Sequence, residues 1–286
     1  LKFVNTKSVS IYIPAYNAEK TIRNSLESIK NQTIPFDEII VIDDNSTDFT
    51  KNIVKEFNNV NIISNSVNKG LGYNRNLGVK TSSHQIVTSI DADVVLEKDW
   101  LEIMIKNFEQ NQDIICGGKM IEELTKNKFN AWRAKYYSQN WGNTSFDDPP
   151  FLFGCNTIQT KSVWETVGGY DENLLTNGED IDYTNKIKLH NHINIKYCSD
   201  ALSKHLQDDN LDSLSSRVWR YHSFGYKMKK PSIYKTFKLS LKQIKFFFKR
   251  SVKNLIKLEF NFIFINFAIL IKFILLEHSY YKKFKK

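Results

Sequence analysis

The sequence predicts an α/β fold, in which a mostly parallel sheet flanked by helices is followed by a C-terminal helical extension. Short apolar runs that suit buried strands alternate with segments whose apolar residues recur every three or four positions, as in amphipathic helices. This alternation implies parallel strands joined by right-handed crossovers. Beyond residue 230 the chain becomes basic and amphipathic, which predicts helices.

The expected elements follow one another along the chain. Strands are expected at 9–13, 38–42, 60–63, 85–90, 114–116, 151–156 and 193–197, and helices around 22–29, 53–57, 72–81, 100–108, 179–190 and 211–221. The stretch 129–141 is rich in Trp and Tyr, and it suits either a partly exposed stacking surface or a second small core.

The positive charge belongs to the C-terminal region. The net charge is +9, but residues 231–286 contain thirteen Lys and Arg against Glu259 and Glu277, which leaves 1–230 near −2. This distribution, without a recognisable base-reading module, argues against nucleic-acid binding. Cys116, Cys155 and Cys198 are odd in number and widely spaced, which favours a reducing, cytoplasmic compartment and argues against a disulfide framework.

Polar segments end three of the predicted strands, at 16–17, 43–44 and 91–93. Ligands of such sheets bind outside the carboxyl ends of the strands, so these segments are expected to converge. Asp91 and Asp93 stand at i and i+2, from which both carboxylates can approach one cation. Mg²⁺ or Mn²⁺ held by few carboxylates takes its other ligands from water and substrate phosphates. The alternative is an acidic pair in a solvated loop.

The other candidates on the donor side of this edge also have two interpretations. Asp43 and Asp44 could cap the helix expected after Ser46, or one of their carboxylates could accept a hydrogen bond from a nucleotide base. Arg75 could pair with an acidic neighbour, or its planar guanidinium could face a diphosphate.

Later in the chain, Glu179 and Asp180 begin a predicted helix, where the dipole favours acids. A carboxylate held there could instead serve as a general base. His205 could be a hydrogen-bonded structural histidine or a metal ligand.

Five motifs in order make the sequence resemble a family 2 glycosyltransferase with the GT-A fold, a Rossmann-like sheet, over about 9 to 225. The resemblance rests on order more than on any single motif. The motifs are Ser10 to Glu19 (SIYIPAYNAE), Ile42 to Asp48 (IDDNSTD), Asn68 to Gly70 with Arg75 to Gly78, Asp91 to Asp93 (DAD), and Val167 to Glu172 (VGGYDE) with Gly178 to Asp182 (GEDID).

The resemblance implies a role for each matched residue. Asp180 would be the catalytic base, and Asp93 would bind Mn²⁺ or Mg²⁺, with His205 as a further ligand. Val94 follows the motif where the family often has another acid. The implied donor-binding residues are Pro14, Ala15, Tyr16, Glu19, Asp44, Arg75, Asp91 and Ala92. The acceptor-side candidates are Asn156, Trp132 and Glu179.

The implied activity is inverting transfer of a sugar from a nucleoside-diphosphate donor, expected to be a UDP-sugar, to a hydroxyl of a glycan or lipid-linked acceptor. Residues 1–228 would form the catalytic domain, with 1–95 binding the donor and 96–228 the acceptor. A nucleotidyltransferase is the first alternative, although it should carry a Gly-rich phosphate loop after the first strand. A non-catalytic sugar- or membrane-binding protein is the second.

Residues 229–286 are expected to form a basic amphipathic tail. Lysines recur every three or four residues from 235 to 253, and apolar residues from 237 to 252 recur on another face. This pattern is typical of an anionic membrane surface, and the alternative is a helix packed on the catalytic domain. The apolar run 260–271 is short for a span, which favours a helix lying in the interface or joining an oligomer. The expected location is cytoplasmic, peripheral on the inner face of the membrane.

Overall fold

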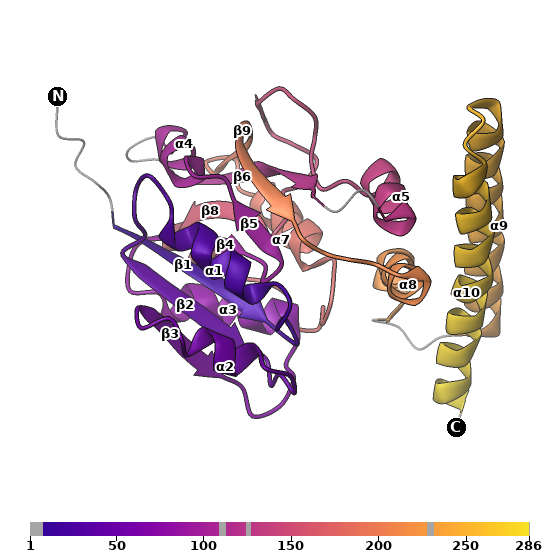
Figure 1. Ribbon diagram of the computed structural model, residues 1–286, viewed down its shortest axis with the longest axis horizontal. Helices are drawn as coiled ribbons and strands as arrows, with labels where there is room; N and C mark the ends of the chain where they lie inside the picture. Colours follow the sequence, from indigo (N-terminus) through magenta and orange to yellow (C-terminus); the bar gives the residue numbers. More distant parts are fainter. Residues whose placement is uncertain (1–7, 109–112, 124–126, 228–231, 286) are drawn as a thin grey trace. The chain divides into compact units, whose positions relative to one another are not determined.

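The structure, a computed structural model, describes residues 8–108, 113–123, 127–227 and 232–285. The chain forms two compact units, of which the first comprises 1–123 and 139–206 and the second 124–138 and 207–286. Figure 1 shows a sheet with helices in the first unit and helices in the second.

The first unit is built on one mixed sheet. Its strands are β1 (Val9–Ala15), β2 (Glu38–Asp43), β3 (Val60–Ser64), β4 (Ile86–Ile90), β5 (Val94–Leu96), β6 (Ile114–Glu122), β7 (Phe146–Asp147), β8 (Asn156–Thr160) and β9 (Asn194–His205). They lie in the order β3-β2-β1-β4-β8-β6-β9-β5, and β7 pairs with β9. The first four strands along the chain are parallel, as predicted, whereas β8 runs antiparallel to both of its neighbours.

The helices of the first unit lie on both faces of this sheet. They are α1 (Ile22–Lys30), α2 (Thr50–Val54), α3 (Leu71–Thr81), α4 (Trp100–Lys106), α6 (Lys161–Val167) and α7 (Glu179–Ile187). Because side chains alternate along a strand, β1 serves two cores. Its Ile11 and Ile13 pack in a cluster with Leu26 of α1, and its Tyr12 packs in another with Val79 of α3. A sandwich of helix, sheet and helix results.

The register brings the polar strand ends together. Ala15 at the end of β1 is paired with Asp43 at the end of β2, and both strands run parallel to β4, which precedes Asp91. A second convergence lies across β9, where His205 is paired with Glu122 of β6 and with Val94 of β5. The expected edge therefore exists, and it is extended by the ends of β6 and β9.

Several elements differ from their predictions. The strand expected at 151–156 begins only at Asn156, and in the irregular segment before it the carbonyl of Gly154 accepts a hydrogen bond from Arg75. The strand expected at 114–116 continues to Glu122, and the helices α5 and α6 were not anticipated. Asp43 and Asp44 do not cap the next helix. That helix begins at Thr50, whose backbone N–H donates to Asp48 Oδ1 at 3.0 Å.

The second unit is helical, with α5 (Lys128–Tyr136), α8 (Leu211–Lys227), α9 (Ile233–Ile256) and α10 (Phe260–Lys285). Residues from all four helices meet in one apolar core, which is formed by Trp132, Leu214, Val218, Phe247, Ile265, Ile269 and Phe273. The compact units therefore divide the chain at 206 rather than at the expected boundary of 228, because α5 and α8 share a core with the tail. The rings of 129–137 belong to this core rather than to an exposed stacking surface.

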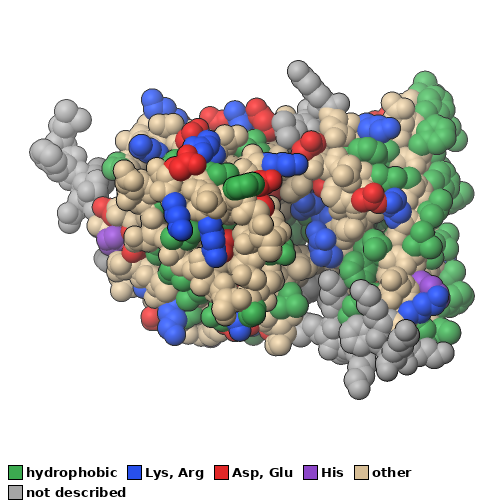
Figure 2. All heavy atoms as spheres, turned by 60° about the horizontal axis from the view of Figure 1, so that its bottom comes forward, with side chains coloured by type: hydrophobic (Ala, Val, Ile, Leu, Met, Phe, Trp, Pro, Cys, Tyr) green, Lys and Arg blue, Asp and Glu red, His purple; other side chains and the backbone are tan. Residues whose placement is uncertain are grey.

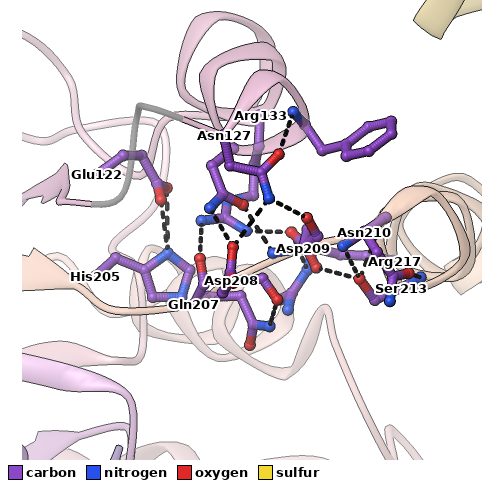
Figure 3. A network of polar contacts seen from close by, with 12 residues as sticks. Glu122, Asn127, Arg133, His205, Gln207, Asp208, Asp209, Asn210, Ser213 and Arg217 are labelled. Atoms are coloured by element: carbon purple, nitrogen blue, oxygen red, sulfur yellow. Dashed lines mark hydrogen bonds and ion pairs between the residues drawn. The ribbon is translucent and has the colours of Figure 1, made fainter.

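A buried polar network fixes the start of this unit (Figure 3). The guanidinium of Arg133 pairs with the fully buried carboxylate of Asp209 and donates to the backbone oxygen of Gln207 at 2.8 Å. Asn130 accepts from the backbone N–H of Asp209 at 2.8 Å, and its amide donates to Asp208 at 2.7 Å. These contacts hold the segment that leads into α8 against α5.

Candidate active site

The loop after β1 is tied to the loop after β2. The carbonyl of Ala15 accepts from Asp44 N–H at 2.8 Å, and Pro14 and Ala15 are buried. Glu19 accepts from the backbone of Phe49 at 3.1 Å, so its carboxylate positions the second loop. Tyr16 is the exception, since 53% of it is exposed at this edge. Its ring is thus available to a ligand.

Asp44 is buried and its carboxylate is fully used within the protein. One oxygen accepts from Lys69 N–H and Asn65 Nδ2, each at 2.8 Å, and the other accepts from Gly70 N–H at 2.9 Å. Gly70 has a φ of 85°, a left-handed conformation that favours glycine. Asp44 therefore shapes the loop that leads into α3, whereas its neighbour Asp43 closes its own loop and pairs with Lys51 at 3.3 Å.

Arg75 lies at the centre of the site. Its side chain is buried and donates from Nε to Glu179 at 3.1 Å and from Nη2 to Asp91 at 3.0 Å. Nη1 donates to Ser89 Oγ at 2.7 Å and to the carbonyl of Gly154 at 2.8 Å. Of the two interpretations of Arg75, the structure therefore has the ion pair with acidic neighbours. Arg75 links the predicted donor side, at Asp91, to the predicted acceptor side, at Glu179.

The two carboxyl groups at the start of α7 have raised pKa values. Burial raises the pKa of Glu179 to about 7, and Asp180 beside it adds to the rise while Arg75 opposes it. Glu179 Oε2 is buried and has no hydrogen-bond partner within the described residues. Burial also raises the pKa of Asp180, against the lowering effect of Arg75. Asp180 accepts from the backbone N–H of Gly154 at 3.4 Å and of Ile181 at 2.8 Å, which fixes its orientation.

Asp91 joins this group from the end of β4. Its side chain is 31% exposed, so one part faces Arg75 and another can meet a ligand. Burial raises the pKa of Asp91, Arg75 lowers it, and the adjacent Asp93 raises it again. Asp91 and Asp93 thus repel each other, and a cation bound between their carboxylates would relieve this repulsion.

Asp93 faces a histidine and a second carboxylate. His205 Nε2 lies 3.3 Å from Asp93 Oδ2, and His205 Nδ1 lies 3.1 Å from both oxygens of the buried Glu122, as Figure 3 shows for the latter pair. Burial lowers the pKa of His205, but the carboxylates of Asp93 and Glu122 outweigh this effect and raise it to about 9. Glu122 holds the ring so that Nε2 is directed towards Asp93.

The donor set at this point fits a divalent cation. Among the described residues, no group of three or more His, Cys, Asp or Glu side chains forms a complete metal cage. A carboxylate oxygen and an imidazole nitrogen are nevertheless within 3.3 Å of each other, and the ring's other nitrogen is fixed by an acid. Metal-binding histidines ordinarily have such a partner, and the remaining ligands of Mn²⁺ or Mg²⁺ come from substrate phosphates and water.

Two acceptor-side candidates lie elsewhere. Asn156 is buried, and its side chain accepts from Trp100 Nε1 and donates to Ser203 Oγ, each at 2.8 Å. Trp132 is buried in the core of the second unit and donates from Nε1 to Asn266 at 2.8 Å. Both are structural residues in this fold, because their polar atoms are already paired in the interior. Of the three acceptor-side candidates, Glu179 alone is bonded to Arg75.

Three residues of the site, Ser89, Glu122 and Gly154, were not predicted from the sequence. Ser89 and the backbone of Gly154 bind Arg75, and Glu122 orients His205. Glu122 has a signal in the sequence, because it ends the strand that starts at Ile114, just as Asp43 and Asp91 follow the ends of their apolar runs. The roles of Ser89 and Gly154 have no such signal, since they depend on where Arg75 lies in three dimensions.

Comparison with known proteins defines the class. The family model "Glycosyl transferase family 2" matches residues 10–168. An uncharacterised glycosyltransferase of Haemophilus influenzae is 30% identical over 65% of this chain and 59% of its own length. A poly-β-1,6-N-acetyl-D-glucosamine synthase of Staphylococcus epidermidis is 26% identical over 78% of this chain and 55% of its own length. This chain therefore spans a little over half the length of these relatives.

Solved structures share the fold. A mannosyltransferase of Pyrobaculum calidifontis in complex with GDP-Man and Mn²⁺ has a TM-score of 0.60 and 18% identity, over 77% of this chain and 62% of that one. TarS residues 1–349 of S. aureus in complex with UDP-GlcNAc has a TM-score of 0.54 and 22% identity, over 75% and 65%. The chain belongs to glycosyl transferase family 2, as its motifs predicted, and its fold is that of glycosyltransferases of the GT-A type.

Proposed function

We propose that the protein is an inverting glycosyltransferase that moves a sugar from a nucleoside-diphosphate donor, a UDP-sugar, to a hydroxyl of a glycan or lipid-linked acceptor. The observation that carries the proposal is the position of Arg75. It is bonded to Asp91 on one side and to Glu179 on the other, and it shares Gly154 with Asp180. Donor-side and acceptor-side carboxylates are thus fixed within one network.

Asp180 is proposed as the general base. Its carboxylate is held by two backbone N–H groups, and its pKa is raised by burial. A carboxylate with a raised pKa is a stronger base, so it accepts the acceptor's hydroxyl proton more readily as the oxygen attacks the anomeric carbon. Attack in line with the departing diphosphate inverts the anomeric configuration. Glu179, one residue earlier, has a pKa of about 7, so near that pH it would be about half protonated, and its protonated form would donate a hydrogen bond.

Asp93 and His205 would hold the cation, and Asp91 would contact the donor. When bound, Mn²⁺ or Mg²⁺ stabilises the negative charge that develops on the leaving diphosphate. Ala15 and the exposed ring of Tyr16 would line the nucleotide. Asp44 and Glu19 would act indirectly, because their carboxylates hold the loops on either side. The relatives with UDP-GlcNAc and with GDP-Man and Mn²⁺ support a nucleotide-sugar donor and a divalent metal.

The acceptor and the location follow from the relatives and from the tail. A polysaccharide synthase among the similar proteins supports a glycan acceptor, and a glucosyl-dolichyl phosphate glucuronosyltransferase of Haloferax volcanii, 25% identical, supports a lipid-linked one. We place residues 1–95 at the donor, the rest of the first unit at the acceptor, and the enzyme in the cytoplasm beside the membrane. The three buried, unpaired cysteines suit a reducing compartment.

A donor panel tests this function. The purified chain is incubated with nucleotide-sugars and Mn²⁺, and the products are scored as nucleoside diphosphate or pyrophosphate. We expect diphosphate release that falls about a hundredfold or more in Asp180→Asn. Asp182→Asn, two residues along the same helix and ion-paired with Lys186, is the matched control and should remain near wild type. Pyrophosphate would indicate a nucleotidyltransferase, and a bound but unconsumed donor would indicate a binding protein.

A further inference from the structure

Exposed apolar side chains are concentrated on the second unit. Of twenty-two large apolar residues that are exposed among those described, fifteen lie between 233 and 275. Figure 2 shows hydrophobic side chains gathered along the outer edge of α9 and α10. We call these residues the apolar face: Ile233, Tyr234, Phe237, Leu241, Ile244, Phe248, Val252, Leu255, Ile256, Leu258, Phe260, Phe264, Phe267, Ile271 and Leu275. A patch of this size marks an interaction site.

Helix α9 presents three different surfaces. Its buried side, with Gln243, Phe247 and Asn254, packs inside the unit. The apolar face continues along the helix from Phe237 through Phe248, since its members recur every three or four residues. On a helical wheel the lysines lie next to this stripe, on the side away from the buried residues. The helix contains seven Lys and Arg and no Asp or Glu, so all of its charged side chains are positive.

Helix α10 also has an exposed apolar side and a buried side, and its lysines lie at Lys272 and near its C-terminal end. Its exposed residues Phe260, Phe264, Phe267, Ile271 and Leu275 form one stripe, and its buried residues Ile265, Ile269 and Phe273 lie on the other side. The buried side packs with α8 and α5 residues, and Trp219 of α8 donates to Glu277 at 2.9 Å. The inner side of the helix pair is therefore covered by the unit's own helices, and the stripe is left without a protein partner among the described residues.

The lysines of α9 limit the orientations that α10 can take in a bilayer. By length and composition α10 could cross a membrane, since 260–282 is apolar enough, although a core helix of a soluble protein passes the same test. The two helices pack along each other, however, and the cations of α9 are spread from Lys235 to Lys253. A crossing orientation would place several of these lysines in the hydrocarbon, which is costly. A helix pair that lies flat keeps them at the head groups.

We infer that α9 and α10 together form a monotopic docking surface for an anionic lipid bilayer. In this orientation the apolar face enters the boundary between head groups and acyl chains, and the lysines of α9 contact the phosphates. A second copy of the chain fits less well, because two such surfaces would bring like charges together without an acid on either α9. The inference concerns attachment and is independent of the proposed catalysis.

Vesicle binding tests the surface without any sugar-transfer assay. We expect the full chain to sediment with vesicles containing anionic lipid and less with neutral ones. Phe248→Asp and Phe264→Asp should each weaken partitioning about tenfold or more, because a ring that enters the bilayer is replaced by a charge. Leu189→Asp is the matched control, since Leu189 is 81% exposed in the first unit. Unchanged partitioning of both Phe variants would overturn the inference, as would a soluble dimer that the same variants dissociate.

Measurements of depth in the bilayer distinguish a helix α10 that lies in the membrane plane from one that crosses the membrane. Single cysteines at 264, 267 and 271, in a chain whose three buried cysteines are replaced, are labelled with an environment-sensitive fluorophore. Quenchers at defined depths in the bilayer should report one shallow depth for all three positions, because the helix lies in the plane. A depth that changes steadily along the helix would show that α10 crosses, and the inference would be wrong. Circular dichroism confirms that each labelled protein is folded.

Discussion

The Arg75 network makes a quantitative prediction about stability. Among the described residues, Arg75 is the only cation that is bonded to both Glu179 and Asp91. Arg75→Met removes this cation and leaves both carboxylates in the site. Removing one partner of a buried ion pair costs about 3 kcal/mol or more, because the other charge is left uncompensated. By contrast, Arg23→Met breaks an exposed pair with Glu56, which is expected to matter by less than about 1 kcal/mol. Arg23 is therefore the matched control.

The stability lost in Arg75→Met should depend on pH, because Arg75 lowers the pKa of Glu179. A carboxyl group whose pKa is raised on folding contributes most to stability at low pH, and the contribution is lost as pH rises through the folded pKa. In the wild type this loss is complete slightly above pH 7, the pKa of Glu179. Without Arg75 that pKa rises further, so the variant keeps losing about 1.4 kcal/mol per pH unit above pH 7. The wild type, half ionised at pH 7, still loses about 0.4 kcal/mol, so the difference between the two proteins should widen by up to about 1.6 kcal/mol between pH 7 and 8.5.

Urea unfolding at pH 7.0 and 8.5 measures this difference directly. Arg75→Met with Glu179→Gln should recover part of the lost stability, because the buried acid that needs compensation is gone. A loss in Arg75→Met that is independent of pH, or no larger than in Arg23→Met, would refute the reasoning.

The remaining predictions concern the metal and the second unit. Glu122→Gln should weaken Mn²⁺ binding about tenfold by calorimetry at pH 8.5, because His205 loses its charged partner. The control variant Glu123→Gln, which changes the exposed neighbour of Glu122, should bind Mn²⁺ as the wild type does. Since metal must displace a proton held with a pKa of about 9, wild-type affinity should rise with pH up to that value; a flat profile would exclude His205 as a ligand. Trp132→Phe should lower the melting temperature and leave donor and acceptor KM unchanged; a selective rise in acceptor KM would return Trp132 to the acceptor site.

The donor-side edge could be predicted because its signal is local. Apolar runs that end in Asp43 or Asp91 identify a strand and its carboxyl end in the same few residues, and parallel strands bring such ends together. The arrangement of Arg75 could not be obtained in this way. Its four partners lie 14 to 104 positions from Arg75 in the chain. Nothing in the sequence around Arg75 distinguishes an ion pair with protein carboxylates from a contact with a diphosphate.

The division into units was unpredictable for a related physical reason. The pattern around Trp132 shows that its rings need burial, but it does not specify which segment covers them. In the structure that segment is the tail, through Phe247 and Asn266. Likewise, the amphipathic pattern of 233–256 identifies an apolar stripe correctly, and Phe237 and Phe248 are exposed as expected. It could not show that the helix expected from 260–271 packs beside this one, so that their exposed apolar stripes adjoin.

The stereochemistry of the first-formed product tests the proposed chemistry most directly. With an α-linked UDP-sugar that the enzyme consumes, proton NMR of the anomeric signal distinguishes direct displacement from a two-step route. Attack assisted by Asp180 predicts that the β configuration appears first, and that its rate of appearance falls by about a hundredfold or more in Asp180→Asn. An α product formed first, or a β product formed at the wild-type rate without Asp180, would contradict the assignment of this site.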